Sequence, residues 1–187
     1  MKTFKKTAAA IGAALLIGIA SVAGLADPPS GPATNNTQLA KRVRHELLML
    51  PYYGVFDNLA YNINGSTVTL YGQVVRPTTR SSAERVVKKL PGVARVVNNI
   101  SVLPLSSFDD QIRAATYRSI ARTGGLQRYL MGGNPSLHII VDHGRVTLEG
   151  VVSGKGDRTL AYLAANRVPG VFSVTNNLRV QGENELR

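Results

Sequence analysis

Apolar residues near the start of the chain follow first the spacing of a helix and then that of paired strands. We expect a helix capped by Thr37 and ended by Pro51, because its apolar positions recur every three or four residues, at Leu39, Val43, Leu47 and Leu50. A period of two follows and predicts a hairpin that turns at Asn64-Gly65. Its inward residues are Leu59, Tyr61, Ile63, Val68 and Leu70.

A second helix and a third strand complete this pattern. Ser81 and Glu84 have the spacing of a capping box, and Pro91 with Gly92 marks the end of the helix. Because this helix connects the second strand to the third, we expect those two strands to be parallel, with a right-handed crossover. The helix stripe is Ala83, Val86, Val87 and Leu90, and the strand carries Val93, Val96, Ile100 and Val102.

The whole pattern occurs twice. V-T-L-Y-G at positions 68–72 returns as V-T-L-E-G at 146–150, and the same displacement of 78 positions carries Asn98-Asn99 onto Asn176-Asn177. Self-similarity over this length indicates a duplicated folding unit. The sequence therefore predicts an α+β fold of two tandem αββαβ modules, each a small mixed three-stranded sheet packed on two helices, at 37–104 and 105–182.

The second copy repeats the elements with its own residues. Its first helix starts near Ser107 and Asp110, with Phe108, Ile112 and Ala115 on the apolar side. A glycine closes the second strand of each copy, at Gly72 and Gly150, which indicates a local bend or the close approach of another backbone, such as the crossing helix. The remaining apolar positions are Leu137, Ile139, Val141, Val146, Leu148, Ala161, Ala164, Ala165, Val168, Val171, Val174, Leu178 and Val180.

An insertion distinguishes the second copy. Val43 aligns with Ile112 at a displacement of 69, whereas Val68 aligns with Val146 at 78, so about nine extra residues lie within 122–135. The segment mixes glycines with Arg128, Tyr129 and Leu130. We consider two roles for it: a mobile loop that docks on an interface, or a packed loop that covers one end of the second core.

The first residues have the features of a targeting segment. Three lysines precede an apolar run over 8–23, and Gly24 and Ala26 suit a signal-peptidase site. We expect residues 1–26 to be a signal peptide cut after Ala26, and 27–36 to be an extended leader. The alternative is a retained membrane anchor, although the run is shorter than the roughly 20 residues that span a bilayer. The sequence holds no cysteine for a disulfide or a lipid anchor, so export to a periplasm is our expectation.

The net charge of the chain indicates which class of partner it favours. Removing the three leader lysines from 22 basic residues leaves 19, against 11 acidic ones, a net charge of about +8. This sign favours anionic partners such as phospholipid head groups, although it also serves solubility. An exported chain seldom meets nucleic acid, so we expect none.

Several repeated residues carry a resemblance to a known family. They are Gly72, Gly92, Asn98 and their counterparts Gly150, Gly170 and Asn176, within the runs Val68-Thr69-Leu70 and Val146-Thr147-Leu148. These residues resemble the BON domain family, and the arrangement of a signal peptide before two copies is similar to its osmotically inducible periplasmic proteins. The resemblance implies a non-catalytic module that contacts phospholipid and supports the envelope under osmotic stress. It identifies fold-determining residues more firmly than any ligand.

Two groups of residues are candidates for contact with lipid or a partner. Arg85, Lys88 and Lys89 gather on one side of the second helix, where each could contribute about 1 kcal/mol near an anionic surface. Arg128, Tyr129 and Leu130 lie in the insertion. A solvated basic face and a packed loop are the plainer interpretations of the same residues.

The sequence offers little for catalysis. His138 and His143 flank a strand, but side chains five positions apart face opposite ways and have no further ligands at suitable spacing, so we expect neither a metal nor a cofactor. No nucleophile stands with a partnered base. Asn98 and Asn176 share the parity of core residues, and we expect their amides to bond backbone groups.

Two hypotheses remain alongside an unfavoured enzyme. In the first, the chain is a periplasmic module that binds an anionic membrane surface as a peripheral protein. In the second, it is a protein-protein adaptor or chaperone-like module that uses the groove between its two copies. The oligomeric state is not indicated by the sequence.

Overall fold

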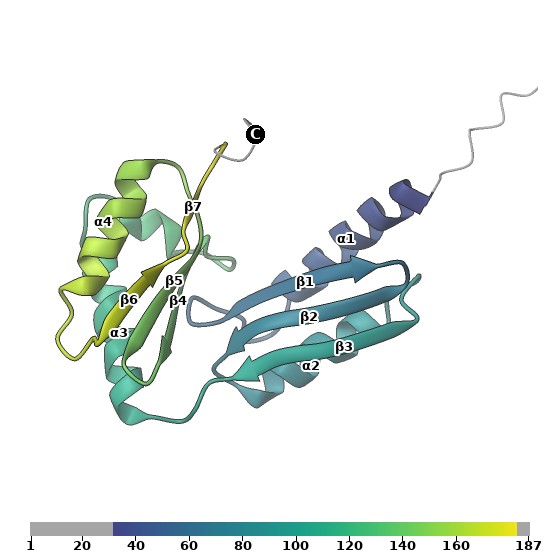
Figure 1. Cartoon of the computed structure of the whole chain (residues 1–187), viewed down its shortest axis with the longest axis horizontal. Coiled ribbons are helices and arrows are strands. Elements are labelled where there is room, and N and C mark those ends of the chain that lie inside the picture. Colours follow the sequence, from purple (N-terminus) through teal and green to yellow (C-terminus); the bar gives the residue numbers. More distant parts are fainter. Residues whose placement is uncertain (1–31, 183–187) are drawn as a thin grey trace, which may run out of the picture. The chain divides into compact units, whose positions relative to one another are not determined.

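The structure, a computed structural model, describes residues 32–182, with side chains from residue 36 onward. The predicted signal peptide and its cleavage site lie outside these residues. Two αββαβ modules follow each other along the chain, as the repeat predicts, and Figure 1 shows each sheet with its helices on one face. Among the described helices, none combines the length and the apolar character that crossing a membrane requires.

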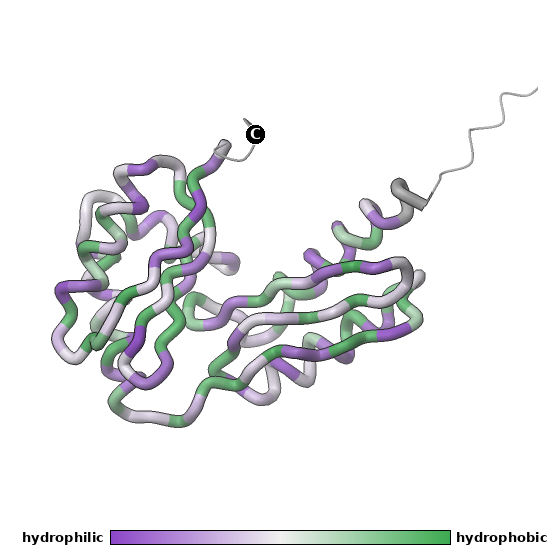
Figure 2. Tube along the Cα trace, in the orientation of Figure 1, coloured by the Kyte–Doolittle hydropathy of each residue, from purple (hydrophilic) through white to green (hydrophobic). Residues whose placement is uncertain are grey.

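The first module consists of α1 (Pro32–Leu48), β1 (Asn58–Asn64), β2 (Thr67–Val74), α2 (Pro77–Lys88) and β3 (Arg95–Val102). Its sheet has the order β1-β2-β3, with an antiparallel β1–β2 pair and a parallel β2–β3 pair. The parallel pairing across a helical connection is thus confirmed. The strands alternate apolar and polar positions, as the hydropathy colours along the trace show (Figure 2).

The second module has the same order with two differences. Its elements are α3 (Ser107–Ala121), the 3-10 turn η1 (Leu126–Tyr129), β4 (Leu137–Asp142), β5 (Arg145–Val152), α4 (Lys155–Asn166), β6 (Ser173–Asn176) and β7 (Arg179–Val180). The expected third strand is divided into β6 and β7, both parallel to β5, because the chain leaves the ladder at Asn177 and Leu178. The turn η1 belongs to the insertion.

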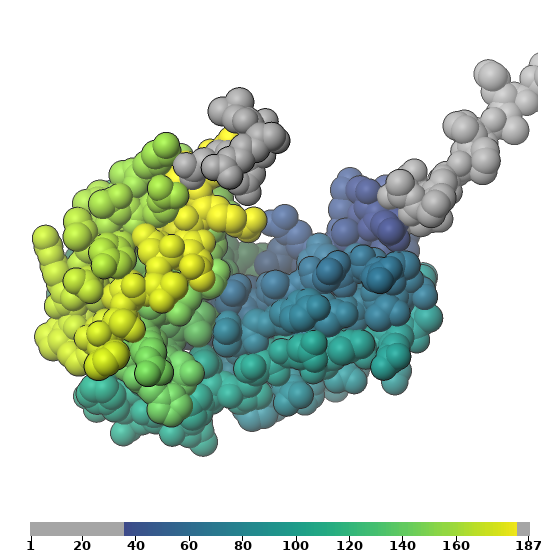
Figure 3. Space-filling model, in the orientation of Figure 1, coloured from purple at the N-terminus to yellow at the C-terminus, as the bar shows by residue number. Residues whose placement is uncertain are grey.

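Each module has its own apolar core. In the first, Val43, Val68, Leu70, Val74 and Val87 are fully buried between the sheet and both helices. In the second, the corresponding side of the sheet packs on α3 and α4, and the insertion adds Leu126, Tyr129 and Leu130 to that core. The opposite face of the first sheet, from β1 to β3, is open on the side seen in Figure 3. The periodic apolar residues thus determine which face of each sheet is covered.

Helix starts differ from our expectations in three places. The helix α1 begins at Pro32, five residues before Thr37, so residues 32–36 are helical instead of extended. The capping box predicted at Ser81 is wrong, because α2 begins at Pro77, which supplies the fixed φ that suits a first turn. In α3 the cap is Ser106, whose hydroxyl accepts a bond from the Asp109 amide, one residue earlier than predicted.

The paired glycines and asparagines have the structural roles that their repetition suggests. A Cβ at Gly72 would lie 2.0 Å from the Asn58 carbonyl oxygen, and one at Gly150 would lie 2.0 Å from that of Ser136. The approaching backbone belongs to the neighbouring strand region and not to a helix, which corrects that detail. The Asn98 amide donates to the Arg80 carbonyl (3.2 Å), and that of Asn176 donates to the Arg158 carbonyl (3.0 Å), so both tie a sheet to a helix.

Candidate functional site

The basic residues predicted on the second helix do share one face. Arg85 and Lys88 of α2 and its C-cap residue Lys89 are exposed, and with Ser81 and Glu84 they line a shallow depression of about 300 Å³. None of the three pairs with a carboxylate among the residues that the structure describes. The face is therefore available to an anion. Whether it binds lipid stays a prediction.

The insertion is a packed loop. Tyr129 and Leu130 are only 6% and 5% exposed, because they fill the core of the second module beside Leu126. The Tyr129 hydroxyl donates to Asp157 (2.6 Å) and accepts from the Ser153 amide (2.9 Å), which fastens the loop to the start of α4. In this conformation Tyr129 and Leu130 are not presented to a surface. Of our two interpretations, the structure favours the packed loop that covers one end of the second core.

Arg128 is the exposed member of this group. Its guanidinium bonds Asp157 at 2.8 Å and lies 4.6 Å from the centroid of the Tyr129 ring. Such an exposed pair holds the side chain in one place but contributes little to stability. As a contact for lipid or a partner, Arg128 would have to exchange Asp157 for the new anion.

Two phenylalanines at the turn end of the second module were missed as surface residues. Phe108, which helical spacing assigned to the core, is 54% exposed, and Phe172 is 80% exposed. A Cβ placed on Gly144, in the β4–β5 turn, would lie 3.7 Å from the Phe108 ring and 3.8 Å from the Phe172 Cβ, so the two side chains flank the same point. The Arg145 guanidinium lies 5.8 Å from the Phe172 ring centroid. We call Phe108, Phe172 and Arg145 the aromatic cluster.

The two copies differ at this cluster. At the displacement of 78, Phe172 corresponds to Ala94 and Arg145 to Thr67, so the first module lacks both the ring and the charge. Exposed aromatic rings beside a cation are typical of contact surfaces, because hydration of an exposed ring is unfavourable and is relieved on binding. Comparison of the copies was the sequence signal that could have found this cluster.

The segment before β1 joins the first module to the second. The Val55 carbonyl accepts a hydrogen bond from the Ile139 amide of β4 (2.7 Å), and Val55 and Phe56 pack against the second core. The Phe56 ring meets that of Tyr117 edge to face, with 6.3 Å between centroids. The Asp57 carboxylate fixes the segment by accepting from the amides of Gly54 (3.1 Å) and Val75 (2.8 Å).

His138 is buried at this junction. A ring nitrogen lies 3.3 Å from the Gly54 carbonyl oxygen, and the ring is 5.6 Å from that of Tyr53. Burial lowers the pKa of His138, so the neutral ring is favoured. Burial also raises the pKa of Asp57, and it raises that of the Tyr53 hydroxyl to about 12. The contacts with backbone and aromatic groups make His138 a packing residue of the junction.

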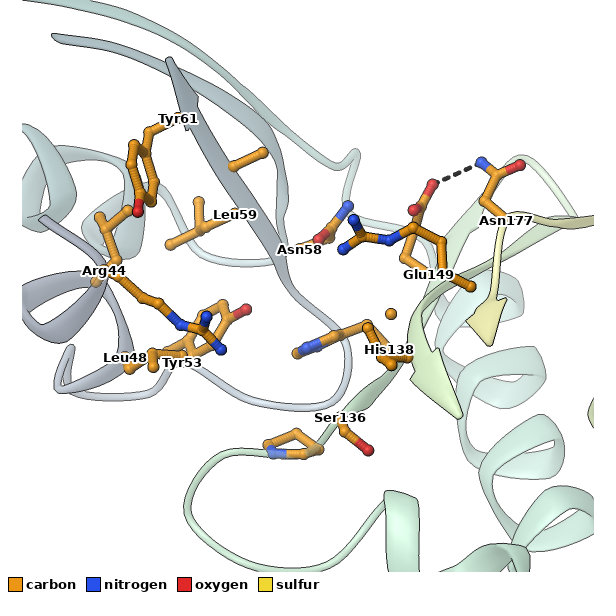
Figure 4. A pocket seen from close by; sticks show the side chains of 16 residues that line it. Arg44, Leu48, Tyr53, Asn58, Leu59, Tyr61, Ser136, His138, Glu149 and Asn177 are labelled. Atoms are coloured by element: carbon orange, nitrogen blue, oxygen red, sulfur yellow. Dashed lines mark hydrogen bonds between the residues drawn. The ribbon is translucent and has the colours of Figure 1, made fainter. Parts of the chain in front are cut away.

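A cleft of about 720 Å³ lies beside this junction. Figure 4 shows Arg44 from α1 and His138 from β4 pointing toward the space, with Tyr53, Leu59 and Tyr61 on one wall. On the other wall Glu149 accepts a bond from the Asn177 amide (2.7 Å). Arg179 lines the same space. The groove between the copies that we expected is thus present, lined by apolar and polar side chains that include two arginines.

Metal chemistry finds no support in this part of the chain. Within residues 32–182, no three side chains of the ligand types His, Cys, Asp and Glu gather where they could hold an ion. His143 is exposed and bonds the neighbouring Asp142 (2.6 Å), while His138 is buried beside Gly54.

Comparison with protein families identifies the module. The family model described as "BON domain" matches residues 35–104 and again 108–182. No curated protein matches the chain. Two solved structures of CdsD, a structural protein of the type III secretion system of Chlamydia trachomatis, are similar at 13% and 12% identity. They cover 76% and 79% of this chain and 96% and 95% of theirs, with TM-scores of 0.32 and 0.30, too low to support a functional comparison.

Proposed function

The chain belongs to the BON domain family, and from that premise we propose that it is a non-enzymatic, exported envelope protein that binds anionic phospholipid surfaces. We place it in the periplasm as a peripheral membrane protein that supports envelope integrity under osmotic stress. The observation that carries the proposal is the aromatic cluster, in which the exposed Phe172 ring stands beside the Arg145 guanidinium and the exposed Phe108 lies at the same turn.

A membrane interface suits each part of this cluster. Phenylalanine rings gain free energy when they leave water for the boundary of the acyl chains, and a nearby arginine pairs with lipid phosphate. Leu105, which precedes α3, is 96% exposed and adds an apolar side chain before the same helix. The cluster therefore combines shallow insertion with attraction to head groups.

The basic face of α2 supports the proposal through charge. Arg85, Lys88 and Lys89 have no carboxylate partners among the described residues, and each could add about 1 kcal/mol at an anionic surface. The face lies on the first module, whereas the aromatic cluster lies on the second. The proposal thus gives the two copies different contributions: charge from one, apolar insertion from the other.

Vesicle flotation tests this function. We expect the protein lacking residues 1–26 to float with vesicles rich in phosphatidylglycerol and not with phosphatidylcholine alone. Phe172→Ala should reduce the partition coefficient onto the vesicles at least about fivefold, because about 1 kcal/mol or more of ring burial is lost. Tyr71→Ala, at an exposed aromatic residue of the first sheet, is the matched control and should float like the parent protein.

Charge reversal provides a second arm. The triple change of Arg85, Lys88 and Lys89 to glutamate should weaken binding further as the salt concentration falls, because screening no longer hides the repulsion. Equal recovery with anionic and zwitterionic vesicles would contradict the electrostatic part of the proposal. Unchanged flotation of Phe172→Ala would contradict the part played by the aromatic cluster.

A further inference from the structure

We propose that the cleft beside the junction binds an extended peptide segment with acidic side chains, which adds as a strand to the outer edge of β1. This inference is independent of the lipid proposal, because it uses other residues. It follows from comparing the same edge in the two copies and from the charges that line the space.

The second copy shows that an outward amide at this edge can take a backbone partner from outside the sheet. The Ile139 amide of β4 donates to the carbonyl oxygen of Val55, which lies in the turn before β1, at 2.7 Å. In the first copy the strand equivalent to β4 is β1, and Tyr61 corresponds to Ile139 at the displacement of 78. The Ile139 amide of β4 thus has a backbone partner from outside its sheet, whereas the corresponding Tyr61 amide of β1 has none among the described residues.

The registers of the two hairpins agree. Ile139 stands opposite Leu148 in β5, and Tyr61 stands opposite Leu70 in β2, again 78 positions earlier. In an antiparallel ladder the N–H and C=O of one residue point to the same side, and the side alternates along the strand. Since the Ile139 amide points away from β5, the Tyr61 amide and carbonyl point away from β2.

The outward edge of β1 is unpaired where it meets the cleft. β1 is the terminal strand of its sheet, and within residues 32–182 no further strand pairs with it. Asn58, Leu59, Ala60 and Tyr61 all line the cleft. Leu59 bonds the Tyr53 hydroxyl through its backbone, which leaves the outward groups of Tyr61 for a ligand. An unpaired edge of this kind is a template for strand addition.

Charge selects the ligand. Arg44 and Arg179 are exposed, stand on walls from different modules, and have no carboxylate partner among the described residues. The one acidic lining residue, Glu149, already accepts a bond from Asn177. A bound segment would therefore need carboxylates for the two guanidinium groups. Between these carboxylates, Leu47, Leu48 and Leu59 offer an aliphatic wall for apolar side chains.

Fluorescence anisotropy tests the site with a labelled probe, the acetylated and amidated heptapeptide Glu-Val-Glu-Val-Glu-Val-Glu, on the protein lacking residues 1–26. We expect saturable binding that Arg44→Glu and Arg179→Glu each weaken about fivefold or more, because each loses one attraction and adds a repulsion. Arg95→Glu, at an exposed arginine of β3 outside the cleft, makes the same charge change and should bind the probe like the parent protein.

Three further probes separate strand addition from simple charge attraction. The lysine version of the heptapeptide should not bind. Acidic probes with N-methyl groups at alternate residues, made in both registers, should lose affinity in at least one register, because a methylated amide cannot donate to β1. A probe with a free C-terminal carboxylate and no glutamate tests whether the carboxylate of a chain end is enough for binding. We expect it to bind much more weakly than the acidic heptapeptide.

Several outcomes would overturn the inference. One is the absence of binding by the acidic heptapeptide at millimolar concentration. A second is binding that survives both Arg44→Glu and Arg179→Glu. A third is equal affinity for the plain probe and both N-methylated probes, which would leave a charge contact without strand addition. Phe172→Ala, which should weaken vesicle binding, should leave peptide binding unchanged.

Discussion

Gly72 and Gly150 each leave no room for a side chain. A Cβ at either position would overlap a carbonyl oxygen of the neighbouring strand region at 2.0 Å, and the φ angles of +114° and +119° are unfavourable for other residues. The repetition of the glycine in both copies therefore records a steric requirement of the hairpin and has no connection with a ligand.

Gly150→Ala should destabilise the second module by about 3 kcal/mol or more, because the strand must move away from Ser136. The midpoint of urea unfolding measures this. Gly156→Ala makes the same change on α4 in open space and should raise the midpoint slightly, as alanine favours a helix by about 0.5–1 kcal/mol. Equal midpoints for the two variants would contradict the steric argument.

Asp109 holds the β4–β5 turn from inside the second module. It is buried, and its carboxylate accepts from the amides of His143 (3.0 Å) and Gly144 (2.8 Å). Asp109→Ala leaves two donors without acceptors and should cost about 2–4 kcal/mol in the free energy of unfolding. Asp142→Ala, at an exposed aspartate of the same turn, should change it by less than about 0.5 kcal/mol, as calorimetry would show.

Burial of His138 makes the stability of the chain depend on pH. Its pKa in the folded protein lies below 6.5, so the unfolded chain binds a proton more readily. The free energy of unfolding should therefore fall as the pH drops through about 6.5, which is the ordinary pKa of histidine. The nearby carboxylates of Asp57 and Glu149 reduce this effect but do not reverse it.

Urea unfolding between pH 5 and 8 measures the dependence. In His138→Gln, where nothing titrates at this position, the slope between pH 5 and 7 should flatten. His143→Gln, at an exposed histidine, should retain the slope of the parent protein. A steep slope that persists in His138→Gln would assign the dependence to other groups.

At the level of elements, the duplication made most of the fold predictable. Because one apolar pattern occurs in two copies, each strand and helix predicted in one copy could be checked against the other. The predicted sheet faces and parallel pairs are confirmed. Helix starts were less predictable, because Thr37 and Ser81 have capping chemistry without being at a terminus. Pro77 was the better signal for α2, since proline suits a first turn and has no amide to leave unpaired.

The candidate sites were predictable only where they are local. Arg85, Lys88 and Lys89 share a face because helical spacing alone determines that geometry. Phe108 has helical spacing too, yet it is exposed, because the sequence does not indicate how far the sheet extends beneath the start of α3. The cleft unites residues from α1, β1, β4 and β7, and no local pattern predicts such a combination.

At the scale of the whole molecule, Phe56 should couple the two modules. It packs on the core of the second module although it belongs to the first, so Phe56→Ala should lower the stability of the second by about 1–2 kcal/mol. Hydrogen exchange at the Ile139 amide should also become faster, because the Val55 segment is held less firmly. Phe172→Ala, the same change at an exposed ring, is the control and should leave that exchange rate unaltered.

The Val55 segment also decides where the chain can be divided. A fragment that starts after Pro104 contains the whole second family match, yet it would lack the Val55 carbonyl that accepts the bond from the Ile139 amide of β4. The unpaired edge of β4 could then pair with the backbone of another molecule. We expect such fragments to dimerise or precipitate. The boundary of the duplicated unit therefore differs from the boundary of a stable fragment. A fragment of the second module should also include residues 53–57.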